Sequence, residues 1–168
     1  MIETFLGDQI LFTGTARAEV TEFERVNTKE NREKISKTLD TLGLENVELK
    51  ENEKGLTISI ENIQFLPDSS ELVPAEKEKL ARIAEILKGF ENDLLVTGHC
   101  ANRGTLRNQQ RISEQRAASV AEYLSTLKVR EPKCIFTQGK GASEPVASNS
   151  TEAGRAKNRR VEITIMDE

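Results

Sequence analysis

Residues 98–117 read Gly-His-Cys-Ala-Asn-Arg-Gly-Thr-Leu-Arg-Asn-Gln-Gln-Arg-Ile-Ser-Glu-Gln-Arg-Ala, and this stretch decides the fold. It joins a short apolar run at 94–97 to a helical pattern that continues to about Thr126. Near the end of the chain, residues 154–163 read Gly-Arg-Ala-Lys-Asn-Arg-Arg-Val-Glu-Ile. Alternating apolar residues over 161–165 then predict a last strand with one buried face.

The rest of the chain supplies the other elements of an α/β two-layer sandwich. Asn27 and Glu30 have capping-box spacing at the start of a helix that Gly43 can close. Residues 1–25 weakly suggest strand alternation. The order strand, helix, strand, helix, strand, strand predicts the sandwich, preceded by an N-terminal helix-hairpin extension. We expect further helices at 28–42, 74–88 and 106–126, a hairpin at 47–60, and strands at 94–97 and 134–137.

Composition narrows the class of protein. The 168 residues are 36% hydrophobic and 31% charged, which suits one domain with a small appendage. A net charge of -4 gives no broad positive field for a phosphate backbone, so nucleic acid is not an expected partner. No apolar run approaches the roughly 20 residues of a membrane span. The amino terminus lacks the basic-then-apolar order of a secretory signal, so an envelope protein would be represented by a mature fragment.

The thiols and the histidine do not indicate catalysis, a cofactor or a metal. Cys100 and Cys134 lack metal-ligand and CxxC spacing. If their strands run parallel, the two thiols lie roughly 15 Å apart, too far for a disulfide. We expect both to be small buried hydrophobes. His99, the only histidine, is expected to bond to backbone at a strand end. A thiol enzyme using Cys100 is a remote alternative.

Taken together, the motifs resemble the OmpA-like carboxyl-terminal domain, the peptidoglycan-binding module of Gram-negative envelope proteins. The resemblance covers roughly residues 56–166. It implies a mixed sheet in the order β-α-β-α-β-β over residues 56–168, with 1–55 as an extension or a small second unit. It also makes four residues a structural signature that ties the last strand to nearby backbone, namely Arg155, Asn158, Arg159 and Arg160.

The family motif reads Gly-His-Thr-Asp-x-x-Gly, followed by Asn-x-x-Leu-Ser-x-x-Arg-Ala. In the family, the Asp and the Arg hold the ammonium and carboxylate groups of diaminopimelate in the wall peptide. Here the Arg is kept as Arg116, but the Asp is replaced by Ala101. Alternatively, Arg116 simply pairs with Glu114 or with a carboxylate across the turn. The ligand-binding residues that the resemblance implies, if binding is retained, are Arg116, Cys100, Ala101, Gln109 and Ser113.

The missing acid leads to two functional hypotheses. Either diaminopimelate binding is lost or altered and the chain is an envelope scaffold with a protein partner, or it is an active non-covalent peptidoglycan tether that uses Arg116. In the second case the stem peptide of the wall carries a different diamino acid, and Arg116 still receives a carboxylate. Separately, Glu114 or Asp68 could in principle substitute for the missing acid. Under both hypotheses the protein is a non-enzymatic periplasmic module, associated with the outer membrane through an anchor not present in this chain.

Overall fold

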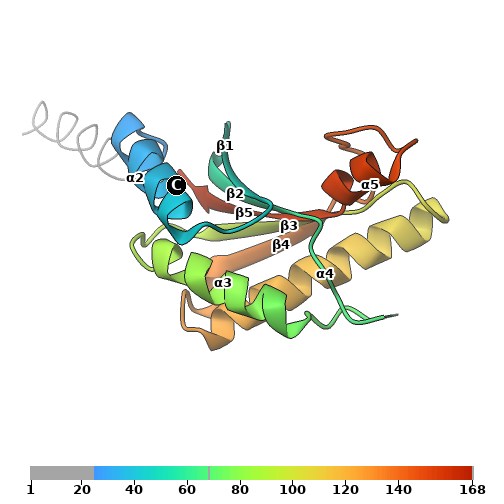
Figure 1. Ribbon diagram of the computed structural model, residues 1–168. Coiled ribbons are helices and arrows are strands. Elements are labelled where there is room, and N and C mark those ends of the chain that lie inside the picture. The colour runs from blue at the N-terminus through green and yellow to red at the C-terminus, as the bar shows by residue number, and fades with distance from the viewer. Residues whose placement is uncertain (1–24, 68, 168) are drawn as a thin grey trace, which may run out of the picture.

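The computed structural model describes residues 25–67 and 69–167, and its framework is one five-stranded mixed sheet (Figure 1). The strand order is β1-β2-β5-β3-β4. β3 and β4 run parallel, whereas the other neighbouring pairs run antiparallel. The predicted mixed sheet is therefore confirmed. The strands are β1 (Val47–Asn52), β2 (Gly55–Glu61), β3 (Leu94–His99), β4 (Ile135–Gly139) and β5 (Arg160–Met166).

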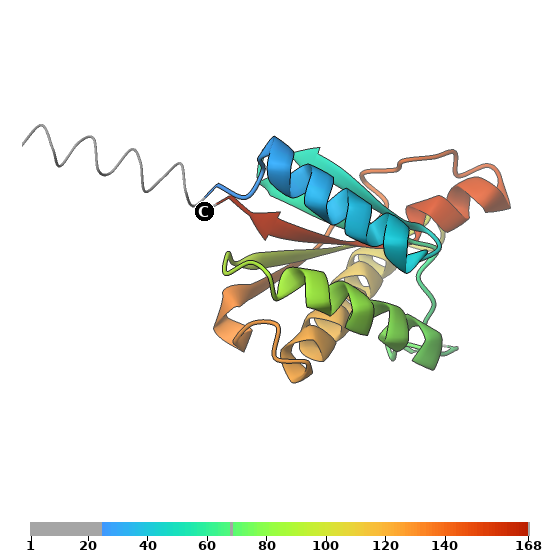
Figure 2. The ribbon, with the colours of Figure 1, turned by 60° about the vertical axis from the view of Figure 1, so that its left-hand side comes forward.

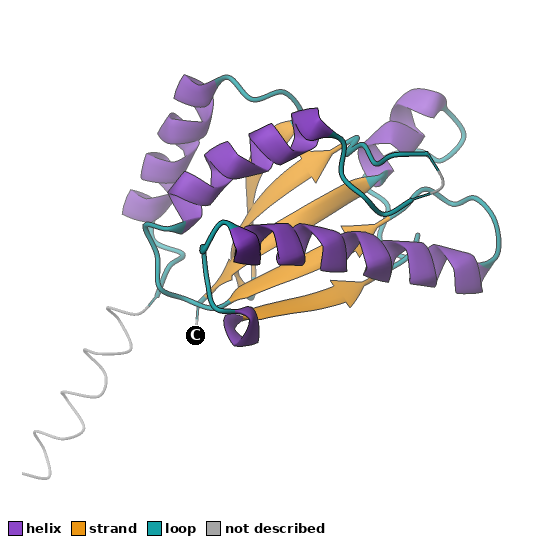
Figure 3. Cartoon of the chain, turned by 90° about the horizontal axis from the view of Figure 1, so that it is seen from below, coloured by secondary structure: helices purple, strands orange, loops and turns teal. Residues whose placement is uncertain are grey.

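The longer helices pack on one face of this sheet. Seen from below, α3 and α4 lie across the strands (Figure 3), and α2 lies beside α3 and contacts β1 (Figure 2). The short helix α5 lies on the side of the sheet away from α3 and α4 (Figure 1). The helices are α2 (Lys29–Leu42), α3 (Pro74–Leu87), α4 (Leu106–Thr126), the 3-10 turn η1 (Pro132–Cys134) and α5 (Glu152–Asn158).

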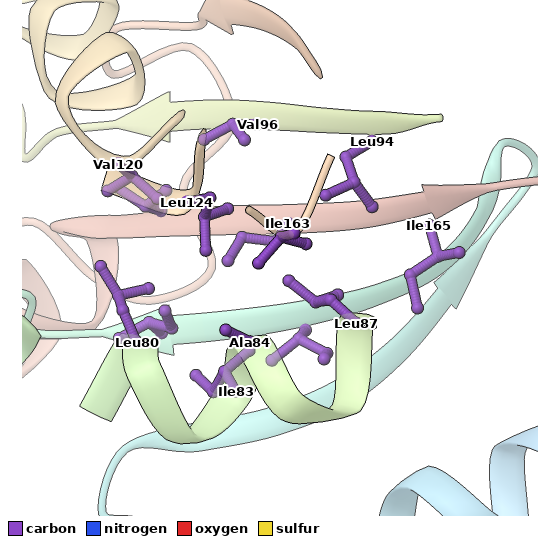
Figure 4. Close-up of a cluster of buried hydrophobic side chains, with 14 of the residues drawn as sticks. Leu80, Ile83, Ala84, Leu87, Leu94, Val96, Val120, Leu124, Ile163 and Ile165 are labelled. Atoms are coloured by element: carbon purple, nitrogen blue, oxygen red, sulfur yellow. The ribbon is translucent and has the colours of Figure 1, made fainter. Parts of the chain in front are cut away.

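The core lies between the sheet and the helices α2, α3 and α4 (Figure 4). Every second residue of β2, β3 and β5 points into it, as the alternation predicted. Burying one such aliphatic side chain contributes about 1.5–3 kcal/mol. The core residues on the helices are Leu80, Ile83, Ala84 and Leu87 of α3 and Ala117, Val120 and Leu124 of α4.

The amino-terminal elements join the same sheet and core. β1 pairs with β2 along its whole length, and Ile35 of α2 is 1% exposed within the core cluster. The capping prediction was one residue early, because Thr28 accepts the hydrogen bond from Asn31 N at 3.1 Å, whereas Gly43 closes the helix at φ +61° as expected. The predicted division at residues 55 and 56 falls at the start of β2 and stays a prediction. The alternation expected over residues 1–24 lies outside the described residues.

Two other local predictions differ from the structure. Helix α5 was not predicted, because seven residues show little periodicity and Gly154 in the middle disfavours a helix. Cys134 ends the 3-10 turn rather than starting β4. Both cysteines are free, and Cys100 is buried as expected, whereas the burial expected of Cys134 was wrong, because it is only half-buried at the end of the 3-10 turn.

Two features are absent from the part of the chain that the structure describes. No helix in residues 25–67 and 69–167 has the length and apolarity needed to cross a bilayer. Within the same ranges, no three His, Cys, Asp or Glu side chains gather as metal ligands would.

Candidate functional site

Arg116 lies on the side of α4 that faces the loop after β2. Its guanidinium carbon is 4.8 Å from the centre of the Phe65 ring, a cation–π contact. Burial lowers the pKa of Arg116, Cys100 opposes that shift, and the charge of Arg159 lowers the pKa further. Among the described residues, no carboxylate lies within ion-pair distance of this guanidinium. Arg116 is thus a partly desolvated cation that stacks on a ring and lacks a described counter-ion.

Glu114 does not supply the missing carboxylate. Its Oε2 accepts a hydrogen bond from Gln110 Nε2 at 2.8 Å, and its Cγ lies beside Gly139. Residues 114 and 116 point to different sides of a helix, since each residue turns it by about 100°. The alternative in which Arg116 pairs with Glu114 is therefore not what the structure shows. Asp68, the other candidate acid, lies outside the described residues.

A cavity of about 750 Å³ opens between α4 and the loop at residues 65–70. Two guanidinium groups face it, those of Arg111 and Arg116. Arg111 makes only long contacts, 3.3 Å to Asn108 Oδ1 and 3.4 Å to Gln115 Oε1, so its charge remains available. No Asp or Glu occurs among the described lining residues, which are Phe65, Leu66, Pro67, Ser69, Ser70, Arg111, Ile112, Gln115 and Arg116.

Gln109 connects the loop after β3 to the first turn of α4. Its Nε2 donates to Asn102 Oδ1 and to Gly104 O, both at 3.1 Å, and its carbonyl accepts from Cys100 Sγ at 3.6 Å. Gln109 also lines a second hollow of about 400 Å³, on the side of α4 toward Gly141. These bonds hold the loop in place.

Ser113 fixes the turn after β4 in the same way. Its Oγ accepts from Gly141 N at 2.9 Å and donates to Gln110 O at 2.9 Å. Gly141 has a φ of +56°, so the two glycines at 139 and 141 make a tight turn against α4.

The five predicted ligand residues are thus divided between two sides of the helix. Arg116 and Cys100 lie close enough to influence each other electrostatically, and Ala101, next to Cys100, is buried. Gln109 and Ser113 bond to the loops instead. Burial raises the pKa of the Cys100 thiol, although Arg116 lowers it, so the thiol is neutral and poorly suited to act as a nucleophile. The ligand roles of all five stay predictions.

Asn158 and Arg160 of the signature bond to nearby backbone, as predicted, whereas Arg159 pairs with a side chain. Asn158 Oδ1 accepts from Val146 N at 2.7 Å and from Ala147 N at 3.0 Å, and Arg160 Nη2 donates to Glu144 O at 2.9 Å. Arg159, whose charge lowers the pKa of Arg116, pairs with Glu152 at 2.6 Å.

His99 is bonded differently from the prediction. Its Nε2 lies 3.3 Å from Glu162 Oε1 rather than on backbone, because the register of β3 and β5 brings these side chains to one face of the sheet.

Several residues of the cavity were missed from sequence. Ile112 could have been found, because it lies four residues before Arg116 and so shares its side of the helix. Phe65 and Ser69 come from a loop some 50 residues earlier, and no spacing rule connects that loop to α4.

The open mixed sheet and the cavity lined by Arg111 and Arg116 are features of a class of α/β domains. Comparison with known proteins shows to which family of that class the chain belongs. Residues 64–159 match the OmpA family, and the chain belongs to this family. It is 42% identical over 105 residues to the probable lipoprotein YiaD of Escherichia coli, covering 62% of this chain and 48% of that protein. It is 41% identical over 104 residues to the peptidoglycan-binding protein ArfA of Mycobacterium tuberculosis, covering 61% of this chain and 32% of that protein.

Solved structures agree with this placement. The cell wall anchor of the T6SS from Pseudomonas aeruginosa has a TM-score of 0.67 and 32% identity, covering 79% of this chain and 96% of that one. A MotB-like protein from Desulfovibrio vulgaris has a TM-score of 0.74 at 21% identity, covering 91% and 96%, and supports the fold alone. The chain spans about half or less of the curated relatives named above. These relatives are named as a probable lipoprotein and as a peptidoglycan-binding protein.

Proposed function

We propose that the chain is a non-enzymatic cell-envelope module whose pocket keeps the carboxylate-binding half of the family site and has lost the ammonium-binding half. The single observation that supports this proposal is Arg116, a partly buried guanidinium that lines a large cavity and has no carboxylate partner among the described residues. A structural arginine that is desolvated normally has a paired acid. An arginine without one is suited to receive a carboxylate from a ligand.

The replacement of the family Asp by Ala101 weakens the grip on diaminopimelate. Ala101 is buried and its methyl group accepts no hydrogen bond, so an ammonium bound beside it would lack its charged partner. Losing one member of a desolvated charge pair costs about 2–5 kcal/mol. That is roughly a 30- to several-thousand-fold loss of affinity. Diaminopimelate binding in the family manner is therefore lost or altered.

A second candidate is an active peptidoglycan tether with a modified pocket around Arg116. The size of the cavity favours it, because about 750 Å³ is room for part of a wall peptide. The names of relatives such as the peptidoglycan-binding protein ArfA also favour it. Under either candidate we infer a periplasmic location with outer-membrane association. If wall binding is lost, we infer an envelope protein as the partner. Nucleic acid is not proposed as a partner.

Retention on purified peptidoglycan distinguishes the candidates. Wild type and Arg116→Ala are compared with Arg107→Ala, which removes an exposed arginine of the same helix that does not line the cavity. The tether predicts that wild type and Arg107→Ala are retained and that Arg116→Ala is retained at least tenfold less. If none of the three proteins is retained, the scaffold stands. Equal retention of all three would contradict a role for Arg116.

A further inference from the structure

We propose that the outer edge of β4 pairs with β4 of a second copy of this chain, antiparallel and centred on Thr137, so that two sheets join into one. β4 is the last strand in the sheet order, and no described helix or strand continues the sheet beyond it (Figure 3). The side chains at this edge are open to solvent, since Phe136 is 49% exposed and Thr137 is exposed as well. The edge is separate from the pocket at Arg116, whose described lining comes from α4 and the loop at residues 65–70.

The backbone of β4 points alternately toward β3 and toward the open edge. Lys140 N donates to Gly98 O, next to the end of β3, at 2.9 Å. In a parallel ladder the residues that bond to one neighbouring strand alternate with residues that turn both their N–H and their C=O away from it. The residues at positions 135, 137 and 139 therefore direct their backbone groups outward.

Two of these outward groups are already bonded within the chain. Ile135 N donates to Pro132 O of the 3-10 turn. Gly139 O accepts from Gln110 Nε2 of α4 at 2.7 Å. The carbonyl of Ile135, the N–H and the carbonyl of Thr137, and the N–H of Gly139 receive no hydrogen bond from the described residues. The edge thus presents two donors and two acceptors that need partners.

Antiparallel pairing centred on Thr137 satisfies these groups and no others. Thr137 exchanges both of its bonds with Thr137 of the second copy, and Gly139 N donates to Ile135 O on each side of the two-fold axis. The two groups that are already bonded, Ile135 N and Gly139 O, lie opposite each other in this register, so neither lacks a partner. A register shifted by two residues would set a free group of Thr137 against one of the bonded groups. The pattern of free groups is therefore self-complementary in one register.

The side chains fit the same register. Phe136 lies on the face of the sheet away from α4, beside Leu95 of β3. Across the axis it would meet Gln138 directly and Phe136 of the second copy diagonally, which is within reach of an aromatic ring. The two Thr137 hydroxyls would face each other, as cross-strand Thr pairs do. Residues 135–139 contain no charged side chain, so no like charges oppose the pairing.

The opposite edge of the sheet has the protection that β4 lacks. β1 carries Glu48, Lys50 and Glu51, and α2 packs against it. Glu51 also pairs with Arg32 of α2 at 3.3 Å. Charges and a covering helix are the usual means by which a protein keeps an edge strand from pairing. Their presence at β1 and their absence from β4 favour pairing through β4.

The dimer should be weak and reversible. A pair of five-residue strands buries less than the roughly 1,200–2,000 Å² of a stable interface. We expect a dissociation constant of about 10–1,000 µM, so dimers become abundant only when the chains are concentrated or held close together.

Sedimentation velocity of the whole chain tests the association. Between about 10 µM and about 1 mM the average mass should rise from that of one chain toward that of two. Thr137→Pro removes the outward N–H without touching the bonds to β3, and edge strands tolerate proline, so this variant should remain monomeric. Thr137→Val keeps the N–H and should dimerise like wild type. Circular dichroism melting shows that both variants are folded.

Cross-linking tests the register. In a Cys134→Ser background, oxidised Thr137→Cys should link two chains, because position 137 meets itself at about 5.5 Å between Cα atoms. Gln138→Cys is the matched control. Its two copies would lie more than about 7 Å apart, beyond the reach of a disulfide, and should not link. If Thr137→Pro does not fold, this pair of variants still decides.

Three results would overturn the inference. The first is a wild-type chain that stays monomeric at about 1 mM, well above the expected dissociation constant. The second is equal linking of Thr137→Cys and Gln138→Cys, which would exclude the register. The third is slow hydrogen exchange of the Thr137 amide in the monomer, because another part of the chain would then already cover the edge.

Discussion

Glu162 shows how one partly buried carboxylate joins two neighbouring strands of the sheet. It lies on the face of β5 away from the core, between His99 and Arg160, which bond to its two oxygens at 3.3 and 2.9 Å. Burial alone would raise the pKa of Glu162, but the bonds and charges of His99 and Arg160 outweigh it and lower the pKa to about 2. The carboxylate thereby fixes the end of β3, where the loop that carries Cys100 and Ala101 begins.

This arrangement predicts a pH-dependent stability. The pKa of Glu162 falls from 4.5 to about 2 on folding, so its contribution is complete above about pH 5 and disappears as the pH falls toward 2. Glu162→Gln should lower the free energy of unfolding by about 2–3 kcal/mol at pH 7 and should reduce its decline between pH 5 and 2. Urea unfolding at several pH values measures both effects. The control is Glu78→Gln, at an exposed site on α3. A full acid-dependent decline in Glu162→Gln would show that other carboxylates cause it.

At the level of single residues, the sequence predicted Arg116 as the cation of the site but did not predict the side chains that contact it. Arg116 follows from motif spacing, because residues 98–117 keep the order and spacing of the family motif, which places its Arg at position 116. Its contact with Phe65 depends on how a loop of another segment folds over α4, and local patterns carry no information on that. His99 was assigned to backbone because its partner, Glu162, becomes a neighbour only through the pairing of β3 with β5.

The elements most accurately predicted are those with long periodic patterns. α4 begins at Leu106 and ends at Thr126, as the sequence indicated, and the hairpin of β1 and β2 turns at residues 52–55. α5 was missed because contacts stabilise it more than propensity does. Gly154 would weaken an isolated helix, but here it lets the helix approach the carbonyl of Ser148, which a Cβ would strike.

Gly154→Ala therefore tests the packing of α5. In a solvated helix this change would stabilise by up to about 1 kcal/mol. Against the Ser148 carbonyl we expect it to destabilise by about 1–3 kcal/mol, because backbone must shift to admit the methyl group. Differential scanning calorimetry should show a lower melting temperature. Ala153→Ser, an exposed change in the same helix, should leave it nearly unchanged. A stabilised Gly154→Ala protein would mean that α5 does not pack this closely.

At the scale of the whole molecule, the amino-terminal elements and the family-like part share one core. Ile35 of α2 is 1% exposed and belongs to the same cluster as Ile58 of β2. We expect one cooperative unfolding transition across residues 25–167, because α2 and β1 have no separate core to retain once β2 is lost. Ile35→Ala should lower the free energy of unfolding by about 2–5 kcal/mol. Circular dichroism and hydrogen exchange of α2 amides should report the same transition.

Two separate unfolding transitions would contradict this prediction. If Ile35→Ala released α2 and β1 in an early transition while β3 and α4 kept their full protection, the amino-terminal part would be a small second unit docked on the family-like part. The matched control is Ser36→Ala, which changes a residue of α2 outside the core cluster and should shift neither transition. Ile35→Ala distinguishes one folding unit from two, because Ile35 of α2 lies in the same core cluster as the residues of β2, β3 and β5. If the amino-terminal part had its own core, Ile35→Ala would lower the stability of that part alone and would leave the pocket at Arg116 unchanged.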